Sequence, residues 1–100
     1  MSLTTVSEKI LVVDDDPLNL QFVTRTLARA GFATAAAVDG DEALEAIRTG
    51  WFDAVVSDVR MARMSGIQLL QNIRARFPSL PVILMTGLIE DDIREASAAW

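Results

Sequence analysis

Residues 10–17 read Ile10-Leu11-Val12-Val13-Asp14-Asp15-Asp16-Pro17, so that four apolar residues run directly into three carboxylates. A short apolar run bounded by turn residues is typical of a strand buried in a parallel sheet. Two further runs have this form: residues 54–57 lead into Asp58, and residues 82–85 lead into Thr86-Gly87. Ligands of open α/β sheets bind outside the carboxyl ends of the strands, so we expect these polar residues to share one crevice.

Strand-like runs alternate with segments of helical spacing along the whole chain. Four strands are expected, at residues 9–14, 32–37, 53–58 and 81–86. Strands that alternate with helices in this way are typical of βαβ units, in which the crossovers are right-handed. The sequence therefore predicts an α/β fold, a doubly wound parallel sheet with helices on both faces.

Helices are expected between these strands. Asp16 can cap a helix that starts at Pro17 and stops at Gly31. A second opens within residues 39–42, a third follows a loop of residues 59–65, and a fourth begins at an acidic cap within residues 90–92. The predicted inward faces of the first three are Leu20, Val23, Leu27 and Ala30; Ala43, Leu44 and Ile47; and Ile67, Leu70, Ile73 and Phe77.

Length and composition limit the classes of protein that this chain can be. Its 100 residues, 51% of them hydrophobic, suffice for one packed domain, which we place at residues 1–100. The net charge of −5 argues against direct nucleic-acid binding by this segment. The chain has no cysteine and no histidine, which excludes thiolate chemistry and imidazole ligands. Without a signal layout or a membrane-spanning run, we expect a soluble, cytoplasmic protein.

The acidic residues predict a metal site. Asp16 suffices as a helix cap, which leaves Asp14 and Asp15 unexplained at the end of a buried strand, where an isolated charge is costly. Carboxylates that lie close together repel each other unless a cation lies between them. Hard carboxylate oxygens suit Mg²⁺, with Mn²⁺ as an alternative, and Mg²⁺ commonly binds one or two carboxylates and a phosphate. We therefore expect an acidic, metal-dependent phosphoryl site.

Two further residues fit phosphoryl chemistry, although each also has a purely structural interpretation. Asp58 could simply end a strand, but beside a bound metal its carboxylate could act as a nucleophile toward phosphorus. Thr86 could be an ordinary β-branched strand residue, but before Gly87 its hydroxyl could donate a hydrogen bond to a phosphoryl oxygen. Arg60 follows Asp58 closely enough to contribute its backbone oxygen or its charge.

Four motifs together resemble the receiver domains of two-component response regulators. They are Val13-Asp14-Asp15-Asp16-Pro17, Ser57-Asp58-Val59-Arg60-Met61, Met64-Ser65-Gly66-Ile67-Gln68-Leu69-Leu70 and Leu84-Met85-Thr86-Gly87. Their order and spacing match over nearly the whole chain. The resemblance implies a flavodoxin-like sheet with strand order 2-1-3-4, followed in the family by a fifth strand and helix.

The resemblance also implies roles for individual residues. Asp58 would accept a phosphoryl group from a histidine kinase or a phosphotransfer protein. Asp15, Asp58 and the backbone carbonyl of Arg60 would bind Mg²⁺ directly, with Asp14 acting through water, and the Thr86 hydroxyl would signal phosphorylation. The chain would then switch an output domain or a partner protein, in some cases as a homodimer. It would catalyse its own phosphotransfer and dephosphorylation without being an enzyme in the usual sense.

The chain departs from the family pattern at its C-terminal end. The family's fifth strand and helix, and the lysine that pairs with the phosphoryl group, have no counterpart within the 100 residues. Lys9 is the only lysine, and five strand residues separate it by roughly 16 Å from the carboxyl end of its strand. We therefore expect a C-terminally incomplete receiver whose natural chain continues.

Two alternatives remain open at this point. The missing lysine is compatible with a receiver-like interaction module that is no longer phosphorylated. A phosphohydrolase similar to haloacid dehalogenases would also use an aspartyl phosphate, but it needs a nucleophile on the first strand in an Asp-x-Asp-x-Thr/Val pattern. The run Asp14-Asp15-Asp16-Pro17-Leu18 fails at the last position of that pattern.

Overall fold

A computed structural model of the chain describes residues 8–85. In this part of the chain, strands and helices alternate strictly. They are β1 (Lys9–Val13), α1 (Pro17–Arg29), β2 (Ala33–Ala37), α2 (Gly40–Thr49), β3 (Ala54–Asp58), α3 (Gly66–Arg76) and β4 (Val82–Met85). Residues 86–100, on which the predicted fourth helix falls, lie outside the described residues.

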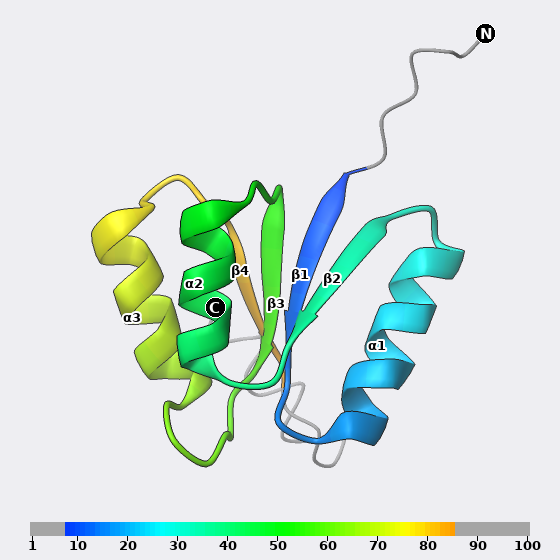
Figure 1. Ribbon diagram of the computed structural model, residues 1–100, viewed down its shortest axis with the longest axis horizontal. Coiled ribbons are helices and arrows are strands. Elements are labelled where there is room, and N and C mark those ends of the chain that lie inside the picture. The colour runs from blue at the N-terminus through cyan, green and yellow to red at the C-terminus, as the bar shows by residue number, and fades with distance from the viewer. Residues whose placement is uncertain (1–7, 86–100) are drawn as a thin grey trace, which may run out of the picture.

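The four strands form one parallel sheet in the order β2-β1-β3-β4. Helix α1 covers one face of the sheet, while α2 and α3 lie together on the other face (Figure 1). The predictions of a doubly wound parallel sheet and of this strand order are therefore confirmed. Because β1 and β3 are neighbours at the centre, the residues that follow them emerge at the same edge of the sheet.

The main core lies between the sheet and the pair α2 and α3. Alternate residues of a strand point to opposite faces, and one set from β1 and β3 packs against both helices. The fully buried members are Leu11, Val13 and Val55 from these strands, Ala37 from β2, Ala43 from α2, and Leu69 and Ile73 from α3. This packing holds the carboxyl ends of β1 and β3 at fixed positions.

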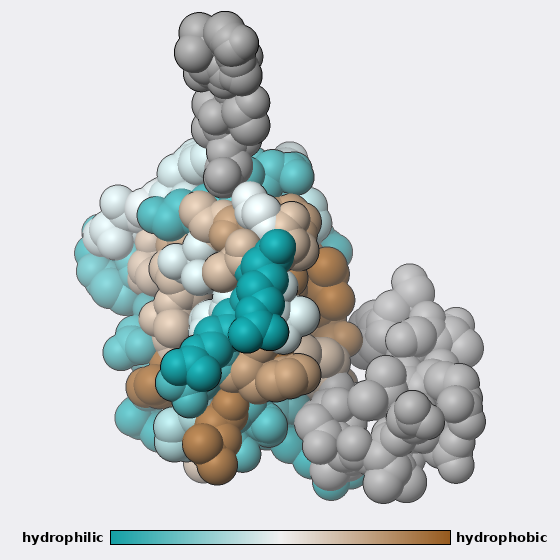
Figure 2. Space-filling view, turned by 90° about the vertical axis from the view of Figure 1, so that its right-hand side faces the viewer, coloured by the Kyte–Doolittle hydropathy of each residue, from teal (hydrophilic) through white to brown (hydrophobic). Residues whose placement is uncertain are grey.

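Helix α1 is less covered than the pattern predicts. None of its residues is fully buried. Leu20, Val23 and Leu27, which were predicted to face inward, are half-buried, whereas Leu18 and Phe22, which were not, are 75% and 70% exposed. Hydrophobic and hydrophilic residues accordingly alternate on the side of the molecule shown in Figure 2. Ala30, predicted to face inward, is exposed because it is the C-cap of the helix.

The buried residues of α3 also differ in part from those predicted to face inward. Gly66, Leu69 and Ile73 are buried, whereas Ile67, predicted inward, is 41% exposed. Each helical residue is rotated by about 100° from the one before it, so Ile67 points away from the stripe that begins at Gly66. The predicted apolar stripe of α3 is wider than the surface that the sheet and α2 cover. Tertiary packing therefore determines which of its residues stay exposed, and Ile67 is one of them.

Local capping explains where each helix begins. The Asp16 carboxylate accepts a hydrogen bond of 3.0 Å from the Leu18 N–H, and Pro17 is the first residue of α1. Asp39 caps α2 in the same way, and Ser65 forms a capping box with Gln68 at the start of α3. Gly31 has a φ of 101°, a left-handed conformation that ends α1. None of the helices in residues 8–85 is long and apolar enough to cross a membrane.

Candidate functional site

Three carboxylates meet at the carboxyl edge of the two central strands. Asp14 and Asp15 follow β1, and Asp58 is the last residue of β3. One carboxylate oxygen from each lies within 4.8 Å of the other two. Asp14 and Asp58 are only 1% and 8% exposed, whereas Asp15 is exposed. The structure thus brings together three of the carboxylates that the sequence analysis singled out.

Burial and mutual repulsion make the ionised form of this cluster unfavourable. Desolvation raises the pKa of Asp14 above its ordinary value, and the negative charges of Asp58, Asp15 and Asp16 raise it further. The Asp16 N–H opposes this rise because it donates a hydrogen bond of 2.9 Å to Asp14 Oδ1. A cation bound between these oxygens would relieve the repulsion and compensate for the lost hydration. The donor set therefore fits a hard divalent cation such as Mg²⁺.

Asp15 is held by the loop that joins β3 to α3. The Ala62 N–H donates a hydrogen bond of 2.9 Å to Asp15 Oδ2, across 47 residues of sequence. Arg60, the expected source of a carbonyl ligand, is an exposed residue of the same loop. The loop therefore contacts the acidic cluster through its backbone. Ala62 could not be predicted from the sequence, because nothing in an alanine side chain signals a functional N–H.

The same loop returns to the cluster at its far end. The Gly66 N–H donates a hydrogen bond of 2.8 Å to the Val59 oxygen, which closes the loop at the start of α3. A Cβ on Gly66 would collide with the backbone oxygen of Asp58. The φ of Gly66 is not positive, so this glycine is not needed for a left-handed turn, and what it provides is space beside Asp58.

Of the two other positions discussed from the sequence, the structure describes Lys9 but not Thr86. Thr86 lies outside the described residues, although β4 ends at Met85, whose partner in the sheet register is Asp58. Lys9 is the first residue of β1, at the opposite end from Asp14, and its Nζ lies 5.1 Å from the centroid of the Phe52 ring. Lys9 therefore contributes nothing to the acidic cluster, as predicted.

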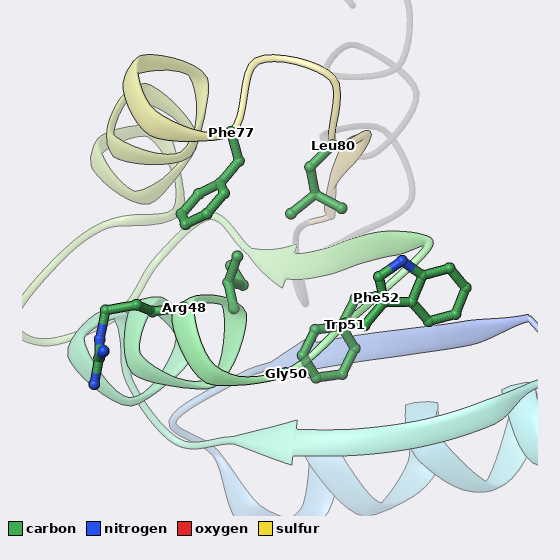
Figure 3. A pocket seen from close by; sticks show the side chains of 7 residues that line it. Arg48, Gly50, Trp51, Phe52, Phe77 and Leu80 are labelled. Atoms are coloured by element: carbon green, nitrogen blue, oxygen red, sulfur yellow. The ribbon is translucent and has the colours of Figure 1, made fainter.

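A largely apolar hollow lies at the other end of the strands, away from the acidic cluster. It encloses about 320 Å³ and is lined largely by aromatic and aliphatic side chains, which are seen in Figure 3. Trp51 and Phe52 come from the segment before β3, and Phe77 and Leu80 from the segment after α3. Arg48 is the only charged residue that lines it, and no carboxylate or hydroxyl does.

Comparison with known proteins identifies this arrangement. The sequence model described as "Response regulator receiver domain" matches residues 10–99. The chain belongs to the response regulator receiver domain family. This membership accounts for the strand order and for the acidic cluster of the receiver, and it leaves no support for a haloacid-dehalogenase-like fold.

Individual relatives agree with this assignment. The transcriptional regulatory protein ZraR of Escherichia coli K12 is 46% identical over 78 residues, which are 78% of this receiver and 18% of ZraR. The chain thus spans about a fifth of that relative. The chemotaxis protein CheY4 of Vibrio cholerae superposes with a TM-score of 0.78 at 30% identity, over 94% of this chain and 80% of CheY4.

A third relative is a structure that contains a metal. The response regulator TrrA of Thermotoga maritima, in complex with Mg²⁺ and BeF, matches with a TM-score of 0.78 and 29% identity. The match covers 90% of this receiver and 80% of TrrA. The metal in that complex belongs to TrrA.

Proposed function

We propose that this receiver accepts a phosphoryl group on Asp58, with Mg²⁺ bound at the acidic cluster, and thereby switches an output. The observation that carries the proposal is the convergence of Asp14, Asp15 and Asp58 within 4.8 Å, two of them buried. A cluster with that much buried negative charge is costly to the fold. A bound cation would offset that cost, and it would also attract the phosphoryl group that Asp58 accepts.

The metal ligands that we propose are oxygens. Asp15, Asp58 and the backbone carbonyl of Arg60 would bind Mg²⁺, or Mn²⁺, directly, and Asp14 would act through a water molecule. The bound cation would neutralise charge on the incoming phosphoryl group, which otherwise repels a carboxylate. The Ala62 N–H would keep Asp15 oriented while the site is loaded. The Mg²⁺ in the TrrA complex supports the choice of metal.

The proposed reaction is a direct transfer from a phosphohistidine. An oxygen of Asp58 attacks phosphorus, an O–P bond forms as the N–P bond breaks, and the imidazole leaves with a proton from solvent. Water reverses the modification by attacking the aspartyl phosphate, which releases inorganic phosphate and restores the carboxylate. Asp58 would thus be both reactant and carrier, without a turnover substrate. The Thr86 hydroxyl would donate a hydrogen bond to the phosphoryl group and report its presence.

The relatives support a proposal for the partners of this receiver. We propose that residues 1–100 are the receiver part of a longer transcriptional regulator, as ZraR is named, and that its natural chain continues. Its phosphodonor would be a histidine kinase or a phosphotransfer protein. Its target would be an attached output domain or a partner protein, with a homodimer as one active form and without nucleic-acid contact by this segment. A cytoplasmic location also remains a prediction.

Intact mass spectrometry tests the assignment of Asp58. The chain, and a version extended through the family's lysine-bearing strand, would be incubated with Mg²⁺ and acetyl phosphate. We expect one base-labile phosphoryl adduct, which Asp58→Asn abolishes. Asp53→Asn is the matched control, because Asp53 lies at the other end of the same segment and accepts its 2.7 Å hydrogen bond from the Lys9 N–H.

The outcomes separate the remaining alternatives. An adduct that persists at full rate in Asp58→Asn would show that another residue is the acceptor. An adduct on the extended chain alone would show that the added segment, with its strand and lysine, is required. If neither chain is modified while both fold, the phosphorylation-incompetent interaction module is the better description.

A further inference from the structure

The loop between β3 and α3 contacts a second element besides the acidic cluster. On one side, its Ala62 N–H holds Asp15. On the other, Met64 packs against Gly40, the buried first residue of α2. In Figure 1 this loop passes close to the end of α2 at which the helix begins. Ala62 and Met64 are two residues apart, so the two contacts hold neighbouring positions of one short loop.

The contact at Gly40 leaves no room for a side chain. A Cβ built on Gly40 would lie 2.5 Å from Met64 Sδ and 3.0 Å from both Met64 Cβ and Cγ. Rotation of a methionine side chain can move its sulfur, but its Cβ is fixed to the backbone. A methyl group at residue 40 would therefore displace the loop backbone or the start of α2. The α2 end is itself anchored, because the Asp39 carboxylate caps it through the Glu42 N–H at 2.8 Å.

A nearby ion pair is too exposed to define the loop position. Arg63 Nη2 lies 3.4 Å from Asp41 Oδ2, and the two side chains are 72% and 64% exposed. Exposed pairs contribute little because water screens them and both side chains lose entropy. The shape of the Met64–Gly40 contact is the stronger constraint.

We propose that Gly40 and Met64 are positioning residues for the metal site. Their contact fixes the loop, and the loop orients the Asp15 carboxylate through the Ala62 N–H. The proposal rests on the metal site proposed above. It adds two residues that do not touch the ion but affect its binding, Gly40 at the start of α2 and Met64 in the loop. Groups that orient metal ligands typically change metal affinity by about 10–100-fold when they are lost.

Gly40→Ala tests this role with two measurements. The exchange rate of the Ala62 amide, measured by NMR without metal, should rise toward the rate in Asp15→Ala, which lacks the acceptor. The dissociation constant for Mg²⁺, measured by calorimetry, should rise by about 10-fold or more. Gly50→Ala is the matched control at the other end of α2, where the new Cβ would lie 3.0 Å from the Ala46 oxygen, far from the loop. It should change neither quantity.

Rescue separates positioning from general destabilisation. Met64→Gly in the Gly40→Ala background removes Cβ, Cγ and Sδ together, and with them all three close contacts, so Ala62 protection should partly return. Met64→Ala alone should speed Ala62 exchange, and it serves as the second variant if Gly40→Ala does not fold. The proposal is overturned if both variants keep wild-type Ala62 exchange and Mg²⁺ affinity. If the wild type itself binds no Mg²⁺, the proposed function fails, and Ala62 exchange still decides whether Gly40 positions the loop.

Discussion

Gly66 lies so close to Asp58 that a Cβ on the glycine would overlap the backbone oxygen of the aspartate. This contact joins the first turn of α3 to the end of β3. Because both groups are backbone, no side-chain rotation can relieve a substitution there. The position of the proposed phosphoacceptor therefore depends on a residue that has no side chain.

Gly66→Ala should destabilise the protein by about 1–3 kcal/mol, the usual cost of inserting a methyl group into a well-packed site. In a domain of this size, each kcal/mol lowers the melting temperature by about 4–8 °C. Differential scanning calorimetry would measure the change, with Gly50→Ala as a milder comparison. A Gly66→Ala protein that melts like the wild type would show that the loop shifts without cost.

Mg²⁺ should raise the thermal stability of the chain, because it relieves carboxylate repulsion and binds only the folded state. At a concentration 100 times its dissociation constant, the gain should be about 2.7 kcal/mol. Asp15→Asn should remove most of it, whereas Glu45→Gln, which changes an exposed carboxylate paired with Arg48, should leave it intact. The absence of any shift at millimolar Mg²⁺ or Mn²⁺ would remove the basis for the metal site.

Asp14→Asn should stabilise the metal-free protein at neutral pH. Burial raises the pKa of Asp14 in the folded state, so the folded protein binds this proton more tightly than the unfolded chain does. The ionised carboxylate therefore costs stability above its raised pKa, and this cost disappears as the pH falls below the ordinary value of 3.8. The amide keeps an acceptor for the Asp16 N–H.

Thermal melting in EDTA across a pH series would measure this effect. A gain of ~1 kcal/mol corresponds to a rise of about 4–8 °C in melting temperature. The difference between Asp14→Asn and the wild type should shrink toward pH 3.8 and reverse when Mg²⁺ is added. A variant less stable than the wild type in EDTA at pH 7 would contradict the electrostatic argument.

Thr86→Ala should leave phosphorylation of Asp58 nearly unchanged and impair the response to it. The hydroxyl is expected to bind the phosphoryl group after transfer, not to form the O–P bond. Adduct formation by mass spectrometry and phosphorylation-dependent dimerisation by light scattering, both in the extended chain, would measure the two effects. Thr86→Ser keeps the hydroxyl and should behave like the wild type in both assays.

The sequence alone was sufficient for the architecture, because the signals that define it are local. The apolar runs at residues 10–13 and 54–57, the Asp16-Pro17 cap and the stop at Gly31 each depend on residues adjacent in the chain. Strand order came from the family resemblance. The meeting of Asp14, Asp15 and Asp58 was also predictable, because parallel strands direct their carboxyl ends to one edge.

The tertiary structure alone decided how that cluster is supported. The hydrogen bond from Ala62 to Asp15 and the close approaches of Gly66 to Asp58 and of Gly40 to Met64 have no signature in the side chains concerned. The contacts of Ala62 with Asp15 and of Gly40 with Met64 join different segments of the chain, and the Ala62 contact uses a backbone N–H that every residue except proline possesses. Which of these atoms come within bonding distance depends on how α2, α3 and the sheet pack against one another, and a one-dimensional pattern does not contain that information.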